Sequence, residues 1–120
     1  MAKFYLVLFL VLVLAAAAQA MWGRPGADEK KTAKEKIKKG ARLVDVRSAE
    51  EFVSGHAAGA TNMPLPELEK RVGELGDKAQ DLVVYCGSGV RAAKARKILN
   101  AAGFPNVFNV GGLRDVNEGP

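Results

Sequence analysis

The sequence contains only one cysteine and one histidine in 120 residues. A single cysteine forms no disulfide within its own chain, so Cys86 is a small buried apolar side chain, the partner in an intermolecular disulfide, or a reactive thiol. Nothing in the sequence resembles a metal site or a nucleotide-binding loop, and no internal repeat is present. We therefore predict neither a metal ion nor another cofactor.

Positive charge is in excess by only a small margin, with a formal net charge of +5. Much of this excess lies in residues 30–39, which are rich in lysine. Such lysines most often form the solvated face of a helix, although they can also contact anionic lipid or acidic partner proteins. This moderately basic composition is not that of a nucleic-acid binder, and we expect no nucleic-acid partner.

A long apolar run occurs at the N-terminus, where residues 4–18 follow the positive charge of Lys3. This pattern is typical of a secretory signal peptide, and the small residues of Ala18-Gln19-Ala20 fit the site that signal peptidase recognises. We predict a signal peptide over residues 1–20, removed on export, and no membrane contact afterwards. The alternative is an uncleaved anchor, since a spanning helix needs about 17 to 25 apolar residues.

The remainder of the chain, about a hundred residues, is sufficient for one compact domain. Residues 21–27 contain two glycines and a proline, which predict a flexible leader. We expect a single folded domain over residues 28–120.

Strand-like and helical patterns alternate along this domain. The predicted strands are 42–46, a brief extended piece at 60–63, 81–85 and 106–110. The predicted helices are 28–39, a short helix capped by Ser48 and Glu51, 65–75 and 91–102. This alternation indicates an α/β fold, with a mainly parallel sheet covered by helices on both faces.

Cys86 lies one residue beyond a predicted strand and opens the loop Cys86-Gly87-Ser88-Gly89-Val90-Arg91. Ligands of parallel sheets bind at the carboxyl ends of strands. The two glycines let the backbone curl so that several N–H groups point inward, and the following helix and Arg91 add positive potential. Such surroundings favour a thiolate at Cys86 without a histidine as base. The alternative is an inert buried cysteine at the end of a core strand.

Two groups of residues resemble the rhodanese family. The first is Leu43-Val44-Asp45-Val46-Arg47, then Glu51-Phe52, Gly55-His56, Gly59-Ala60, Asn62 and Pro64. The second is Val83-Val84-Tyr85-Cys86, then Arg91, Ala95, Leu99, Gly103-Phe104, Asn106-Val107 and Gly111-Gly112. The next residues, 113–116, lack the aromatic residue common in the family. They are similar to those of the minimal rhodaneses that bacteria export in the phage-shock response, which implies a periplasmic location.

The resemblance implies that Cys86 takes the outer sulfur of thiosulfate, or of a similar sulfane-sulfur donor, as a persulfide. The sulfur then passes to a thiophilic acceptor, which is cyanide, a thiol or a partner protein. The six residues from Cys86 to Arg91 are typical of family members that handle sulfur, whereas the related phosphatases have a loop longer by one residue. Two alternatives are a module that relays or binds sulfur without efficient turnover, and phosphatase-like chemistry.

These expectations assign a role to each residue of the loop. Cys86 is the nucleophile, and the anionic sulfur and the donor are bound by the backbone N–H groups of Gly87, Ser88, Gly89, Val90 and Arg91. The side chain of Arg91 could instead tie the loop to the sheet.

Three residues outside the loop receive supporting roles. Asp45 and Arg47 are interpreted as residues that organise the loops near the strand ends, and Arg47 could pair with Glu51. His56 is expected to hydrogen-bond the backbone rather than to act as an acid or base.

Overall fold

The computed structural model describes residues 23–118. The predicted signal peptide lies outside the described residues, as do the first two residues of the predicted leader. The elements along the chain are α2 (Ala27–Lys38), β1 (Arg42–Asp45), α3 (Ala49–Ser54), β2 (Thr61–Asn62), α4 (Leu65–Arg71), the 3₁₀ helix η1 (Val72–Leu75), β3 (Leu82–Cys86), α5 (Val90–Ala101), β4 (Val107–Gly112) and α6 (Leu113–Asn117).

The four strands form one parallel sheet in the order β2-β1-β3-β4. At least one helix lies in the chain between each strand and the next, as parallel connections require. The inner strand β3 is buried at every residue, in agreement with the unbroken apolar run from Leu82 to Tyr85. The predicted α/β fold with a parallel sheet is therefore confirmed.

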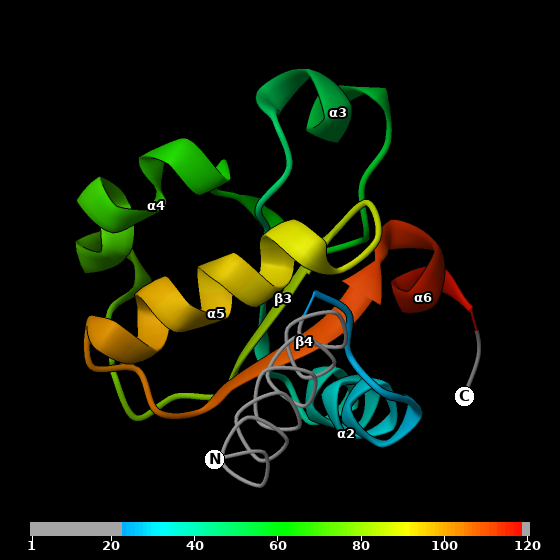
Figure 1. The fold of residues 1–120 in the computed structure, drawn as a ribbon, viewed down its shortest axis with the longest axis horizontal. Helices are drawn as coiled ribbons and strands as arrows, with labels where there is room; N and C mark the ends of the chain where they lie inside the picture. The colour runs from blue at the N-terminus through cyan, green and yellow to red at the C-terminus, as the bar shows by residue number, and fades with distance from the viewer. Residues whose placement is uncertain (1–22, 119–120) are drawn as a thin grey trace, which may run out of the picture.

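Helices cover both faces of the sheet, with α4 and α5 on one face and α2 and α6 on the other (Figure 1). Because side chains alternate along a strand, Val84 and Cys86 of β3 point to the α5 face, where they pack with Leu99. Val83 and Tyr85 belong to the core beneath α2, whose members also include Ala33 and Val110. The end of β3 thus presents Cys86 to one layer and Tyr85 to the other.

Helix α3 begins beyond the carboxyl end of β1 and buries none of its residues (Figure 1). The predicted capping box at its start is confirmed. The Glu51 N–H donates to Ser48 Oγ at 3.2 Å, and the Ser48 N–H donates to the Glu51 carboxylate at 3.3 Å. Because this helix has no core of its own, its position depends on polar contacts with the rest of the chain.

Residues 23–26, which we call the approach segment, lead into α2 and lie against the fold. Pro25 is buried, and α2 begins at Ala27, one residue earlier than expected. A Cβ placed on Gly23 would lie 3.3 Å from Val90, which locates the segment beside the start of α5. In the structure residues 23–26 pack against the fold, and the flexibility expected of the leader over 21–27 stays a prediction.

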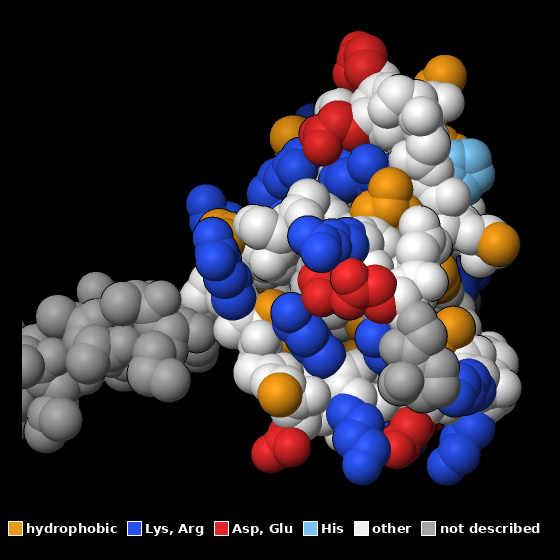
Figure 2. Space-filling view, turned by 90° about the vertical axis from the view of Figure 1, so that its right-hand side faces the viewer, with side chains coloured by type: hydrophobic (Ala, Val, Ile, Leu, Met, Phe, Trp, Pro, Cys, Tyr) orange, Lys and Arg blue, Asp and Glu red, His pale blue; other side chains and the backbone are white. Residues whose placement is uncertain are grey.

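Within residues 23–118, no helix combines the length and apolar character needed to cross a membrane. Figure 2 shows a face on which hydrophobic side chains lie singly among charged ones. In the same part of the chain, the large hydrophobic residues that are exposed are Val53 in α3 and Val90 at the start of α5.

Candidate functional site

Cys86 is the last residue of β3 and is 1% exposed. The sequence placed it one residue beyond the strand, and the structure extends the strand to include it because Cys86 pairs in register with Gly112 of β4. A Cβ on Gly112 would collide with the Gly87 carbonyl oxygen. The absence of a side chain there therefore lets the end of β4 approach the Cys86 loop.

Two backbone amides donate hydrogen bonds to the sulfur of Cys86. The Gly89 N–H lies 3.0 Å from Sγ, and the Ala92 N–H in the first turn of α5 lies 3.4 Å from it. Of the loop residues predicted to bind the sulfur, the structure brings the amide of Gly89 to it. Ala92 was not predicted, although the free N–H groups of a first helical turn are a signal that could have identified it.

The side chain of Arg91 lies between Cys86 and helix α3. Its Nη1 donates to Glu51 Oε1 at 2.7 Å and its Nη2 to Oε2 at 3.1 Å. This pairing raises the pKa of Arg91, with a smaller contribution from Cys86. The hydrogen bond from Arg91 is the main cause that lowers the pKa of Glu51 to about 2. Arg91 thus joins the loop to α3 while its charge remains close to the sulfur.

The predicted ion pair between Arg47 and Glu51 is wrong. Arg47 turns back toward the sheet, where its Nε lies 3.1 Å and its Nη2 2.7 Å from the carboxylate of Asp45. Because Asp45 is fully buried, its charge needs a partner at close range, and Arg47 is two residues away. The hydrogen bond to Asp45 raises the pKa of Arg47. Glu51 is left to pair with Arg91.

Asp45 also accepts a hydrogen bond from the Tyr85 hydroxyl at 2.7 Å, and that hydroxyl accepts one from the Ala57 N–H at 3.0 Å. Burial is the main cause that raises the pKa of Tyr85 to about 12, so the hydroxyl stays protonated and donates. Arg47 further donates to the Gly55 carbonyl oxygen at 2.7 Å. These residues brace the loops that follow β1, at the same end of the sheet as Cys86.

His56 lies in one of these loops. Its Nδ1 is 2.8 Å from the Phe52 carbonyl oxygen, and its ring stacks on that of Phe52 with centroids 3.7 Å apart. The expected hydrogen bond to the backbone is confirmed.

Asn109 supports the loop from β4, and the sequence did not identify it. Its Nδ2 donates to the Gly89 carbonyl oxygen at 2.9 Å, and its Oδ1 accepts from the Gly111 N–H at 2.9 Å. The residue is 2% exposed. Gly87 and Ser88, in contrast, are exposed at the tip of the loop. The loop is therefore fixed at Gly89 and open to solvent at Gly87 and Ser88.

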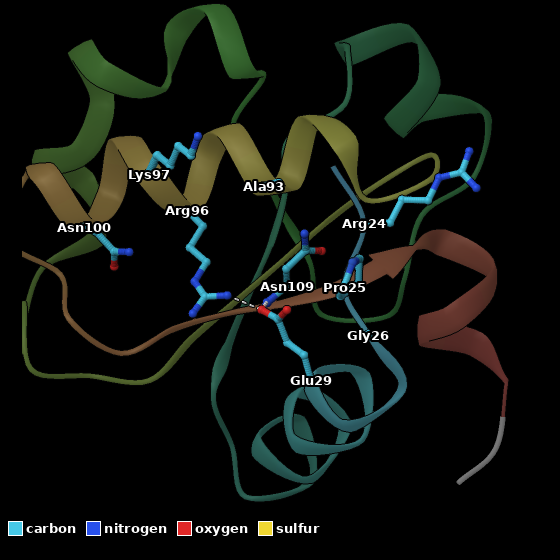
Figure 3. A pocket seen from close by; sticks show the side chains of 9 residues that line it. All are labelled: Arg24, Pro25, Gly26, Glu29, Ala93, Arg96, Lys97, Asn100 and Asn109. Atoms are coloured by element: carbon cyan, nitrogen blue, oxygen red, sulfur yellow. Dashed lines mark hydrogen bonds and ion pairs between the residues drawn. The ribbon is translucent and has the colours of Figure 1, made fainter. Parts of the chain in front are cut away.

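Two cavities flank this region. One of about 450 Å³ is bounded by α3, the start of α4 and Arg91. The other, of about 460 Å³, lies between the approach segment, α5 and Asn109 (Figure 3). Within residues 23–118, no group of three or more histidine, cysteine, aspartate or glutamate side chains is placed to hold a metal ion.

A nearly buried cysteine at the carboxyl end of a parallel strand, with amides of the next loop and helix on its sulfur, defines an α/β protein whose candidate site is a cysteine loop. Comparison with known families gives the same class a name. The Rhodanese-like domain family matches residues 29–118, and the chain belongs to that family.

The relatives that this chain resembles include proteins named as sulfurtransferases and a putative sulfur carrier. The chain is 38% identical over 74 residues to thiosulfate sulfurtransferase PspE of Escherichia coli, covering 61% of this chain and 71% of the relative. It is also 38% identical over 74 residues to the putative sulfur carrier protein YrkF of Bacillus subtilis, where the match covers 61% of this chain and 40% of the relative.

Solved structures agree with this assignment. A structure described as a rhodanese with anions from E. coli has a TM-score of 0.62 at 34% identity, covering 67% of this chain and 95% of its own. The human single-domain sulfurtransferase TSTD1 has a TM-score of 0.62 at 26% identity, covering 81% of this chain and 98% of its own. The chain is thus related to rhodanese-family sulfurtransferases and sulfur carriers.

Proposed function

We propose that this protein transfers a sulfane sulfur from thiosulfate, or a similar donor, to cyanide or a thiol through a persulfide on Cys86. The observation that carries the proposal is the pair of amide N–H groups on Cys86 Sγ, from Gly89 at 3.0 Å and Ala92 at 3.4 Å. Hydrogen bonds to a charged group favour its charged form, so both amides stabilise an anionic sulfur.

The reaction consists of two displacements at sulfur. In the first, the Cys86 thiolate attacks the outer sulfur of thiosulfate, a new S–S bond forms, and the old S–S bond breaks as sulfite leaves with its electron pair. In the second, cyanide or a thiolate attacks the terminal sulfur, and the bond to Cys86 breaks to return the thiolate. Thiocyanate or a new persulfide is the product, and no external oxidant or reductant is required.

The roles of the loop follow its geometry. The amides of Gly89 and Ala92 stabilise Cys86 both as a nucleophile and as the leaving thiolate of the second step. The exposed backbone at Gly87 and Ser88, with the amides of Val90 and Arg91, binds the oxyanion of the donor. Arg91, partly neutralised by Glu51, orients the donor.

The test compares the wild type with Cys86→Ser, which changes one atom and leaves the chain without any thiol. We expect thiosulfate:cyanide activity in the wild type and none above background in the variant. Intact-mass spectra should show one added sulfur after exposure to thiosulfate, removable by dithiothreitol and missing from Cys86→Ser. Equal activity in the two proteins would refute the proposal.

A second candidate is a sulfur relay, supported by the similarity to the putative sulfur carrier and by the pairing of Arg91 with Glu51. Pairing reduces the positive charge available to a dianionic donor such as thiosulfate. The relay predicts one persulfide per protein from a protein or thiol-persulfide donor and very little turnover of thiosulfate. Multiple turnovers with thiosulfate and cyanide would favour the enzyme instead.

We also propose that residues 1–20 are a signal peptide removed on export to the bacterial periplasm, and that residues 28–120 form the domain, preceded by a leader over 21–27. The apolar run of residues 4–18 and the small residues at 18–20 support cleavage after Ala20. The N-terminal sequence of protein recovered from the periplasm tests this, and Met21 is the expected first residue. An N-terminus that retains residues 1–20 would favour the anchor.

A further inference from the structure

The approach segment lies directly against the loop that holds the sulfur. A Cβ placed on Gly89 would lie 2.8 Å from Pro25 Cδ, and one on Gly23 would lie 3.3 Å from Val90. Pro25 is buried, whereas its neighbours Arg24 and Gly26 are exposed. The proline ring is therefore the part of this segment that packs on the loop.

Gly89, the residue that Pro25 contacts, is held from several sides. Its φ is +102°, and a Cβ on it would also lie 3.2 Å from Gly111 Cα. Its carbonyl oxygen accepts from Asn109 Nδ2 at 2.9 Å, and its N–H donates to Cys86 Sγ at 3.0 Å. Pro25 and Gly111 thus both occupy the side of Gly89 to which a side chain would project, and these contacts, with the two hydrogen bonds, set the direction of the N–H that reaches the sulfur.

An open cavity of about 460 Å³ lies on the other side of the approach segment (Figure 3). It separates the segment from the outer face of α5, which contributes Ala93, Arg96, Lys97 and Asn100. Below it, Glu29 of α2 forms an ion pair with Arg96 and accepts from the Asn109 N–H at 3.3 Å (Figure 3). This pairing secures α2 but leaves room beside Pro25, so the segment can move into the cavity if its contact with the loop is lost.

We propose that Pro25 is a positioning residue that keeps the Gly89 N–H directed at Cys86 Sγ, a role that rests on the proposed sulfur chemistry of Cys86. A proline is suited to this positioning role, because its ring fixes φ and presents a rigid surface to the side of Gly89 that carries no side chain. Replacing Pro25 with alanine removes the Cγ and Cδ atoms and frees the backbone. The Gly89 peptide can then rotate, and its hydrogen bond to the sulfur weakens.

The test uses full-length Pro25→Ala with Pro105→Ala as a matched control. Pro105 is exposed and follows α5 at the end away from Cys86, so its change removes a proline without touching the loop. Thiolate formation is followed by far-ultraviolet absorbance against pH, with the spectrum of Cys86→Ser subtracted. Since the only cysteine is Cys86, the difference reports that sulfur alone.

We expect the midpoint of thiolate formation to rise in Pro25→Ala and to stay unchanged in Pro105→Ala, because the thiolate loses part of the hydrogen bond from Gly89. Pro25→Val, which keeps a branched apolar side chain, should give a smaller rise. A second readout is the urea midpoint, which reports stability separately. If Pro25→Ala and Pro25→Val lower the urea midpoint but leave thiolate formation as in the wild type, Pro25 has only a structural role.

Should Pro25→Ala fail to fold, Pro25→Val carries the test against the same control, and an unchanged midpoint in it overturns the proposal. The titration contains no sulfur donor, so it reports the position of Gly89 independently of turnover. If the Pro25 variants change thiolate formation as expected but the wild type transfers no sulfur, the proposed function is refuted and the role of Pro25 is not.

Discussion

The two glycines of the Cys86 loop, Gly87 and Gly89, should differ strongly in how much stability they lose on substitution by alanine. At Gly89 the left-handed φ of +102° costs an alanine about 1–2 kcal/mol. The new Cβ would also lie 2.8 Å from Pro25 Cδ and 3.2 Å from Gly111 Cα, which adds about 1–3 kcal/mol of overpacking. Gly89→Ala should therefore lower the free energy of unfolding by about 2–5 kcal/mol.

Gly87 lacks both constraints. Its φ is not positive, and a Cβ there would meet only Arg91 Nη2 at 3.2 Å, the far end of a flexible side chain. An alanine at a compatible position stabilises a protein by about 0.4–1 kcal/mol through the unfolded chain, which offsets the small shift that Arg91 must make. We expect Gly87→Ala to lie within about 1 kcal/mol of the wild type.

Urea unfolding followed by circular dichroism measures both differences, and thermal unfolding gives a second measure. For a domain of this size each kcal/mol corresponds to about 4–8 °C, so Gly89→Ala should unfold at least about 4 °C below Gly87→Ala. If the two variants unfold at the same urea concentration, the close packing of Pro25 and Gly111 on Gly89 is not what fixes the loop, and the reasoning fails.

Two further predictions concern the polar contacts around the loop. Tyr85→Phe removes the donor to Asp45 and the acceptor of the buried Ala57 N–H, and should cost about 3 kcal/mol in urea unfolding; a loss below about 1 kcal/mol would contradict this. Because Arg91 lowers the pKa of Glu51 to about 2 from 4.5, this group stabilises the fold above about pH 4.5 and loses that effect as pH falls toward 2. The pair is partly exposed and worth less than about 1 kcal/mol, so Glu51→Gln should be slightly less stable than wild type at pH 6, with a difference that shrinks by about pH 3. A difference independent of pH would argue against the pairing.

Much of the fold could be predicted because local sequence and tertiary structure favour the same conformation. Residues 82–85 are apolar without interruption, which suits a strand buried on both faces, and Ser48 with Glu51 forms a capping box from residues three apart. The end of β4 was missed. Strand propensity argues against Gly111 and Gly112, but their pairing with Tyr85 and Cys86 extends the strand.

The position of the proposed reactive cysteine could be predicted from the sequence, but the residues that hold its loop in place could not. The position of Cys86 at a strand end followed from the local pattern. The support of Gly89 by Pro25 and Asn109 did not, because these residues are distant in sequence and meet only in the folded chain. The pairing of Glu51 was also mispredicted, since a neighbour four residues away was weighed without knowing that Asp45 is buried and holds Arg47.

The guanidinium of Arg47 connects the two ends of the segment that contains α3. Arg47 bonds both to Asp45 in β1 and to the carbonyl of Gly55, the residue that follows the helix. Residues 48–54, which lie between these two anchor points, form a surface insert that contributes no side chain to either core. Substitutions at exposed positions such as Val53, or a change in the number of residues, can therefore accumulate there without disturbing the strands. The α3 segment, which contacts Arg91 of the Cys86 loop, can therefore change in evolution while the four strands stay the same.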